Sequence, residues 1–174
     1  IDKLKPSVVI VDILLKSSNG IELTKSIKTQ YPALPVIVFS FHDESLYAER
    51  ALRAGASAYL TKEAESEKIL KAIRTVLNGE LYVSDELSKK LLHKIIGDKT
   101  GKTISPIDNF SDREFEVFRL IGQGYRAAEA AKQLHLSSKT IETYRERIKR
   151  KLGLGDSSEL LRYAIKWSRN HETE

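Results

Sequence analysis

The first half of the chain alternates short, continuous apolar runs with longer amphipathic stretches. Three runs are rich in β-branched and aromatic residues, and we predict that they are strands buried on both faces: Val8–Val11, Val36–Phe39 and Ala58–Leu60. Apolar residues recur at helical spacing in the stretches between and after them, which cover residues 20–29, 44–54 and 65–77. Strands that alternate with helices predict βαβ units and a parallel sheet.

The second half of the chain is predicted to be helical. After a helical pattern over residues 84–96, the stretch that ends at Asn109 is poor in packing residues and contains Gly, Thr, Ser and Pro, which is typical of a linker. Ser111 and Glu114 then form the pattern of a capping box at the start of a helix. Three further helices are predicted at residues 126–134, at residues 138–152 and after a capping sequence at residues 156–159.

These patterns divide the chain into two domains. We expect an α/β domain with a parallel sheet over residues 1–83, a helix and linker over residues 84–109, and an all-α four-helix domain over residues 110–174. The chain has no cysteine, which excludes disulfides and thiolate metal sites. It has no apolar segment of the roughly 18 residues that a membrane span requires and no signal peptide at its start, so we expect a cytoplasmic protein without a membrane partner.

Positive charge is concentrated on the helix predicted at residues 138–152. The whole chain has a net charge of +5, and residues 139–151 contain six basic side chains against Glu142 and Glu146. A basic stripe on one helix is the footprint expected for a polyanionic partner. The alternative is a solvated helix whose charges pair with one another.

The two faces of this helix differ in chemistry. Ile141, Ile148 and Leu152 share one face, which is predicted to point at the core. A short turn precedes the helix, and two helices joined in this way, the second of them basic, are typical of a helix-turn-helix motif. In such motifs the second helix lies in the major groove, where basic residues can bind phosphates and Glu or Thr can meet base edges.

The segment FSDREFEVFRLIGQGYRAAEAAKQLHLSSKTIETYRERIKRKLGL resembles the DNA-binding domain of LuxR/NarL/FixJ-type regulators. The resemblance lies in a Ser before Arg-Glu, a Gly in the first turn, Glu-x-Ala, Leu-x-Leu-Ser, Lys-Thr-Ile and a closing Lys-Leu-Gly. It implies double-stranded DNA as a partner and a homodimer contact through the last helix, which contains Trp167. The alternative is that Trp167 is simply a core residue. By the same resemblance Lys139, Thr140, Arg147 and Lys151 contact phosphates, and Glu142, Thr143 and Glu146 face bases.

Three polar residues of the first domain follow the ends of predicted strands: Asp12, Ser40 and Lys62. Carboxyl ends of parallel strands meet at one edge of a sheet, where open α/β sheets bind ligands. Gly20 lies eight residues after Asp12. Asp12 at this edge can act as a nucleophile, and the Ser40 hydroxyl and Lys62 ammonium can bind phosphoryl oxygens.

The stretches VVIVD, VIVFSFHDE and RAGASAYLTKE, with Gly20, resemble a response-regulator receiver domain of the same regulator family. The resemblance implies a flavodoxin-like fold and makes Asp12 the phosphoacceptor for a sensor histidine kinase. It also implies that Ser40 and Tyr59 are a switch pair and that Lys62 contacts the phosphoryl group.

The resemblance further implies Mg²⁺ as a cofactor. Its ligands would include Asp12, the backbone carbonyl of Leu14 and an acidic pair at the end of the family's first strand. The 174 residues correspond to the family's pattern from the linker into the third strand onward, so the receiver is incomplete. We therefore expect Mg²⁺ to bind only with the complete N-terminal region, which has been removed, is undetermined or comes from another chain.

The leading hypothesis is a transcriptional response regulator, not an enzyme, in which phosphorylation of Asp12 alters dimerisation and DNA binding. A phosphohydrolase of the haloacid dehalogenase type is a weaker alternative, because that chemistry wants a second Asp where Leu14 stands. A third reading is a DNA-binding protein whose unphosphorylated receiver serves only as a dimer platform.

Overall fold

The computed structural model describes residues 1–15, 19–97 and 105–171. The chain forms two compact units, Ile1–Lys102 and Thr103–Glu174. The stretch predicted as a helix and linker, residues 84–109, divides between them: its helix belongs to the first unit and its last residues to the second. Residues 98–104 of that stretch lie outside the described part of the chain.

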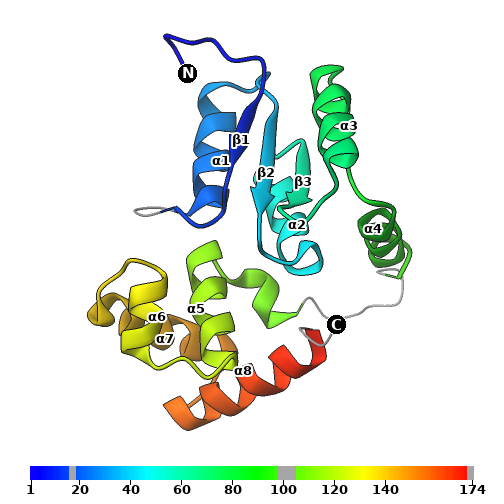
Figure 1. Cartoon of the computed structure of the whole chain (residues 1–174). Coiled ribbons are helices and arrows are strands. Elements are labelled where there is room, and N and C mark those ends of the chain that lie inside the picture. The colour runs from blue at the N-terminus through cyan, green and yellow to red at the C-terminus, as the bar shows by residue number, and fades with distance from the viewer. Residues whose placement is uncertain (16–18, 98–104, 172–174) are drawn as a thin grey trace. The chain divides into compact units, whose positions relative to one another are not determined.

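The first unit is a parallel sheet with helices between its strands. The sheet has the order β1-β2-β3, and both pairs of neighbouring strands are parallel, with Val9 opposite Val36 and Ile37 opposite Ala58. The prediction of an α/β domain with a parallel sheet is therefore confirmed (Figure 1). The elements are β1 (Val9–Val11), α1 (Gly20–Gln30), β2 (Val36–Ser40), α2 (Glu44–Arg53), β3 (Ala58–Thr61), α3 (Ser66–Leu77) and α4 (Asp85–Gly97).

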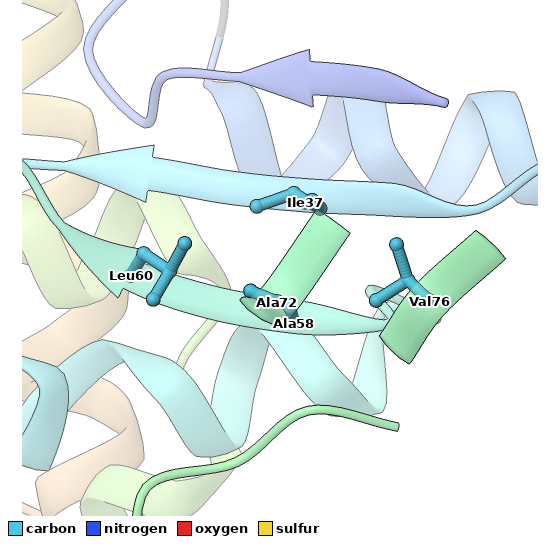
Figure 2. Close-up of a cluster of buried hydrophobic side chains, with 5 residues drawn as sticks. All are labelled: Ile37, Ala58, Leu60, Ala72 and Val76. Carbon is cyan, nitrogen blue, oxygen red and sulfur yellow. The ribbon is translucent and has the colours of Figure 1, made fainter. Parts of the chain in front are cut away.

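Helices cover both faces of this sheet. Successive residues of a strand point to opposite faces, so neighbouring residues of β2 pack against different helices. Val36 packs in one cluster with Val11 and with Ile27 of α1. Its neighbour Ile37 packs in another cluster, formed with residues of β3 and α3 and drawn in Figure 2. Burial on both faces explains why the strands read as continuous apolar runs.

The start of α1 is fixed tightly against the end of β1. The Asn19 side chain is fully buried and accepts a hydrogen bond from the Ile21 N–H at 2.7 Å, which caps the helix. Gly20 follows, and a Cβ added there would lie 1.9 Å from the backbone oxygen of Asp12. Only glycine permits this approach of the helix to the strand end that carries Asp12.

Helix α4 is attached to α2 of the same unit. The Lys90 ammonium donates to the backbone oxygen of Ser45, in the first turn of α2, at 2.7 Å. The Ser84 hydroxyl accepts from the Leu87 N–H at 3.0 Å and closes the first turn of α4. The helix predicted after the sheet is thus held beside the helix that follows β2.

The second unit is helical, as predicted, and its capping box is confirmed. The Ser111 hydroxyl accepts from the Glu114 N–H at 3.3 Å, and the Glu114 carboxylate accepts from the Ser111 N–H at 2.7 Å. The elements are a short 3₁₀ helix η2 (Pro106–Asn109), α5 (Asp112–Gly122), α6 (Ala127–Gln133), α7 (Ser138–Leu152) and α8 (Ser157–His171) (Figure 1).

Helices α5 and α8 pack against each other through aromatic side chains and through Gly122. The Trp167 ring of α8 packs edge-on against Phe115 and Phe118, with centroids 5.6 and 5.5 Å away. Trp167 therefore makes core contacts within its own unit. Further along the seam, a Cβ on Gly122 would lie 2.4 Å from the Ser168 hydroxyl and 2.8 Å from the Ala164 oxygen, so the two helices meet where α5 has no side chain.

A search of the described residues for membrane-spanning helices found none that is both long and apolar enough.

Candidate functional site

Asp12, Ser40 and Lys62 come together at the carboxyl edge of the sheet. The Lys62 ammonium donates to Asp12 Oδ2 at 2.6 Å, and both side chains are about two-thirds buried. The Leu14 N–H lies 3.4 Å from Asp12 Oδ1. The three polar residues that the sequence placed at strand ends therefore form one cluster in the structure.

The electrostatics of this cluster favour the charged form of Asp12. Burial raises the pKa of Asp12, but hydrogen bonds from Lys62 and Ser40 and the charge of Lys62 together outweigh burial. The pKa of Asp12 is consequently held below its ordinary value. At neutral pH the group is a carboxylate, the form in which it can act as a nucleophile.

Ser40 and Tyr59 are both buried, each with about 1% of its surface exposed, and they are linked through His42. The Tyr59 hydroxyl donates to the backbone oxygen of His42 at 2.7 Å, and the His42 N–H lies 3.4 Å from Ser40 Oγ. A change at the Ser40 hydroxyl can therefore reach Tyr59 through one residue of backbone.

Sequence reasoning missed His42 and also Phe41 as parts of this site. The Phe41 ring is largely exposed, and the Lys62 ammonium lies 4.8 Å from its centroid, within the range of a cation–π contact. Both residues directly follow Ser40 in the sequence, so their position after a strand end was the available signal.

The described residues do not by themselves complete a Mg²⁺ site. Among them, no group of three or more His, Cys, Asp or Glu side chains lies close enough together to hold a metal ion. Mg²⁺ prefers octahedral oxygen ligands, and the cluster offers the single carboxylate of Asp12, already paired with Lys62. The predicted Mg²⁺ ligands Asp12 and Leu14 thus remain a prediction.

In the second unit, α7 has one face buried in the core and an opposite face that is polar. Ile141 and Ile148 are fully buried, as predicted, whereas Leu152 is half-buried. The helix is capped at its start by Ser137, whose hydroxyl accepts from the Thr140 N–H at 3.0 Å, and at its end by Gly153, which has the left-handed conformation (φ +67°). The residues predicted to meet DNA are exposed except for Thr140, which is half-buried: Lys139, Glu142, Thr143, Glu146, Arg147 and Lys151.

The charges on this face are divided into paired and unpaired groups. Glu142 pairs with Arg145 at 3.3 Å, and Glu146 pairs with Lys149 at 2.8 Å. By contrast, three exposed cations form no ion pair with any residue that the structure describes: Lys139, Arg147 and Arg150.

Lys151 lies at the end of α7 and contacts the start of α5. Its ammonium lies 2.6 Å from Glu114 Oε2 and donates to the backbone oxygen of Asn109 at 2.9 Å. Burial raises the pKa of Glu114, but the hydrogen bonds from Lys151 and Ser111 outweigh burial and hold that pKa below its ordinary value.

This pKa shift predicts an acid-sensitive contribution to the stability of the second unit. Because the folded-state pKa of Glu114 is lowered from its ordinary value of 4.5, the contribution is fully present above that pH and is lost as the pH falls through the lower folded-state pKa. Urea denaturation followed by fluorescence of Trp167, the only tryptophan, should show the free energy of unfolding falling across this range. Glu114→Gln should flatten the decline, and the exposed control Glu142→Gln should leave it as in the wild type. A Glu114→Gln profile parallel to the wild type would contradict the assignment.

Comparisons with known proteins agree with this geometry. The model of the response regulator receiver domain matches residues 1–74, and that of the bacterial regulatory proteins of the luxR family matches residues 108–164. The chain belongs to the response regulators with a LuxR-family DNA-binding domain.

Individual relatives cover most of the chain. It is 35% identical over 166 residues to the oxygen regulatory protein NreC of Staphylococcus aureus (strain JH9), a match that covers 93% of this chain and 76% of that protein. It is also similar to a solved structure of RcsB from Salmonella enterica serovar Typhimurium bound to the promoter rprA in the presence of the phosphomimetic BeF3⁻. That similarity has 29% identity and a TM-score of 0.52 and covers 94% of this chain and 77% of that one.

Both resemblances seen in the sequence are thereby confirmed, and so is the class of protein. The family consists of DNA-binding regulators rather than of a class of enzymes. The roles of the individual site residues stay predictions.

Proposed function

We propose that the protein is a transcription regulator whose DNA binding is controlled by phosphorylation of Asp12 by a sensor histidine kinase. The observation that carries this proposal is the cluster in which Lys62 lies 2.6 Å from Asp12 Oδ2 and Ser40 bonds the same carboxylate. An ionised carboxylate beside an ammonium and a hydroxyl has the groups needed to accept a phosphoryl group and to bind its oxygens.

Phosphorylation changes the charge that Ser40 and Lys62 face. A phosphoryl group carries about −1.5 to −2 charges at neutral pH, and its oxygens are strong hydrogen-bond acceptors. Lys62 would then bind a phosphoryl oxygen instead of the free carboxylate, and the Ser40 hydroxyl would turn toward the new acceptor.

The consequence of this turn would pass to Tyr59 and α2. His42 bonds both Ser40 and Tyr59, and α2 begins two residues later at Glu44. We take the Ser40–His42–Tyr59 connection and α2 as the two-state element on which phosphorylation acts. A shift of α2 would alter the surface available for a homodimer contact and the attachment of α4 through Lys90.

DNA recognition falls to α7. Its exposed face carries three cations that form no ion pair within the described residues, Lys139, Arg147 and Arg150, for phosphates, and Glu142 and Thr143 for base edges. The RcsB structure in complex with a promoter supports this role by analogy. Mg²⁺, which would help to neutralise charge during phosphoryl transfer, would use Asp12 and the Leu14 carbonyl together with ligands outside the described residues.

The test combines phosphoryl transfer with DNA binding. The purified protein is incubated with acetyl phosphate in the presence and absence of Mg²⁺, and its intact mass and oligomeric state are measured. Affinity is then measured for duplexes selected from a random pool. With Mg²⁺ and the N-terminal region that would supply its remaining ligands, we expect one phosphoryl adduct, a larger dimer fraction and an altered DNA affinity. Sequence-selective DNA binding without any adduct would favour the unphosphorylated platform, and the absence of selective binding would overturn the proposal.

A further inference from the structure

Lys151 was expected to contact DNA phosphates, but its ammonium is already used inside the second unit. A lysine ammonium has three donor hydrogens. Lys151 directs this group at two acceptors, Glu114 Oε2 at 2.6 Å and the backbone oxygen of Asn109 at 2.9 Å. Both acceptors belong to the segment that leads into and starts α5, more than 35 residues earlier in the chain.

The Glu114 carboxylate depends on the Lys151 ammonium as its counter-charge. Its side chain is only 5% exposed, and the same carboxylate oxygen also accepts the Ser111 N–H that starts α5. If Lys151 turned toward a phosphate, it would leave a buried carboxylate without its counter-charge, a strongly unfavourable change. Two of the three donor hydrogens are thus committed, so the geometry opposes a phosphate contact that would draw the ammonium away from Glu114.

Arg147 provides the contrast within the same helix. It lies four residues before Lys151, on the same stripe of α7. Arg147 is exposed, its guanidinium carbon lies 5.8 Å from the centre of the Tyr144 ring, and it forms no ion pair with the described residues. Two basic residues that look equivalent in the sequence thus differ: among the described residues Lys151 forms an ion pair and Arg147 forms none.

We infer that Lys151 is a positioning residue, which fixes the end of α7 to the start of α5 through Glu114 and does not neutralise a DNA phosphate. This inference rests on the proposed DNA-binding function. The phosphate contacts of α7 then come from the three cations that lack an ion pair within the described residues: Lys139, Arg147 and Arg150.

The Lys151–Glu114 pair sets the direction in which α7 leaves the core of the second unit. Ile141 and Ile148 hold the helix against the core, and the Lys151–Glu114 pair prevents its last turn from pivoting about them. A pivot would displace Glu142 and Thr143 relative to base edges. The number of cations that face DNA phosphates would stay the same. Loss of the Lys151–Glu114 pair should therefore reduce selectivity for the preferred DNA sequence more than it reduces non-specific binding.

The salt dependence of DNA binding separates the two roles. Each phosphate contact contributes about −0.9 to the slope of log K against log salt concentration. Arg147→Gln should reduce the magnitude of the slope by about 0.9. Lys151→Gln should leave the slope unchanged, weaken binding to the preferred duplex about tenfold, and weaken binding to unrelated duplexes by less than about twofold.

Two further variants connect the effect to Glu114. Glu114→Gln should reproduce the loss of selectivity, and the double variant should add little to either single one, because both remove the same pair. Lys151→Arg should restore most of the selectivity by keeping the ion pair. Trp167 fluorescence confirms that each variant is folded under the binding conditions, so that the measured losses refer to native protein.

The outcomes are distinct. A slope reduced in Lys151→Gln as it is in Arg147→Gln would overturn the inference by placing Lys151 on a phosphate. Unchanged selectivity in Lys151→Gln and Glu114→Gln would overturn it as well, because the pair would then position nothing. If the wild type bound no duplex selectively, the proposed function would fail, and that result is read before any variant is made.

Discussion

Asp12→Asn is expected to leave the protein with no phosphoryl adduct and with a DNA affinity that acetyl phosphate no longer changes. An amide has no ionised oxygen to attack phosphorus, so the loss should be complete rather than partial. Asparagine has nearly the shape of aspartate, and the Asp12–Lys62 pair is partly exposed, so the fold should be retained. Intact-mass measurement and DNA titration before and after treatment check this result.

A matched control comes from the same unit. Asp43 caps α2 by accepting the Ser45 N–H at 2.6 Å, and asparagine caps helices about as well as aspartate. Asp43→Asn should therefore accept one phosphoryl group as the wild type does. An adduct of undiminished amount in Asp12→Asn would show that another residue is the acceptor.

Gly20→Ala is expected to disrupt the same site without touching any of its functional groups. The new Cβ would lie 1.9 Å from the Asp12 oxygen and 2.9 Å from Ile13 Cα, and both are backbone atoms that cannot rotate away. The start of α1 must separate from the end of β1, and we expect the first unit to lose about 3 kcal/mol of stability, the upper end for overpacking. Phosphoryl transfer should slow as well, because Asp12 moves relative to Lys62.

Hydrogen exchange measures this effect locally. The amides of β1 and α1 should exchange faster in Gly20→Ala, while those of α5 to α8 should not change. Gly79→Ala is the control, since Gly79 has φ of +83° but no atom within 4 Å of an added Cβ. That variant should lose only the roughly 1–2 kcal/mol of a left-handed residue. Equal losses in the two variants would mean that the close approach at Gly20 relaxes easily.

The sequence predicted the strand-end cluster because its geometry follows from topology. Once β1, β2 and β3 are parallel, Asp12, Ser40 and Lys62 must share one edge of the sheet. The link through His42 could not be predicted, because it depends on the rotamer of the Tyr59 side chain. Periodicity places Tyr59 in a buried strand but does not say which backbone oxygen its hydroxyl meets.

The polar face of α7 shows the same limit. Helical spacing correctly put Ile141 and Ile148 in the core and left Lys139, Arg147, Arg150 and Lys151 exposed, whereas Arg145 and Lys149 are half-buried. It could not distinguish Lys151 from Arg147, because the partner of Lys151 is Glu114, which only the packing of α5 against α7 brings near. Residues that pair across distant parts of the chain carry no local signal.

The seam at Gly122 also bears on how the second unit can be redesigned. Ser168 and Ala164 of α8 fill the space that any side chain on Gly122 would need. A library aimed at new DNA sequences should therefore keep Gly122 constant. It can vary exposed α7 positions such as Thr143, which lie on the face opposite the buried Ile141 and Ile148. The position that must stay constant, Gly122, is thus separate from the exposed α7 positions that can be varied.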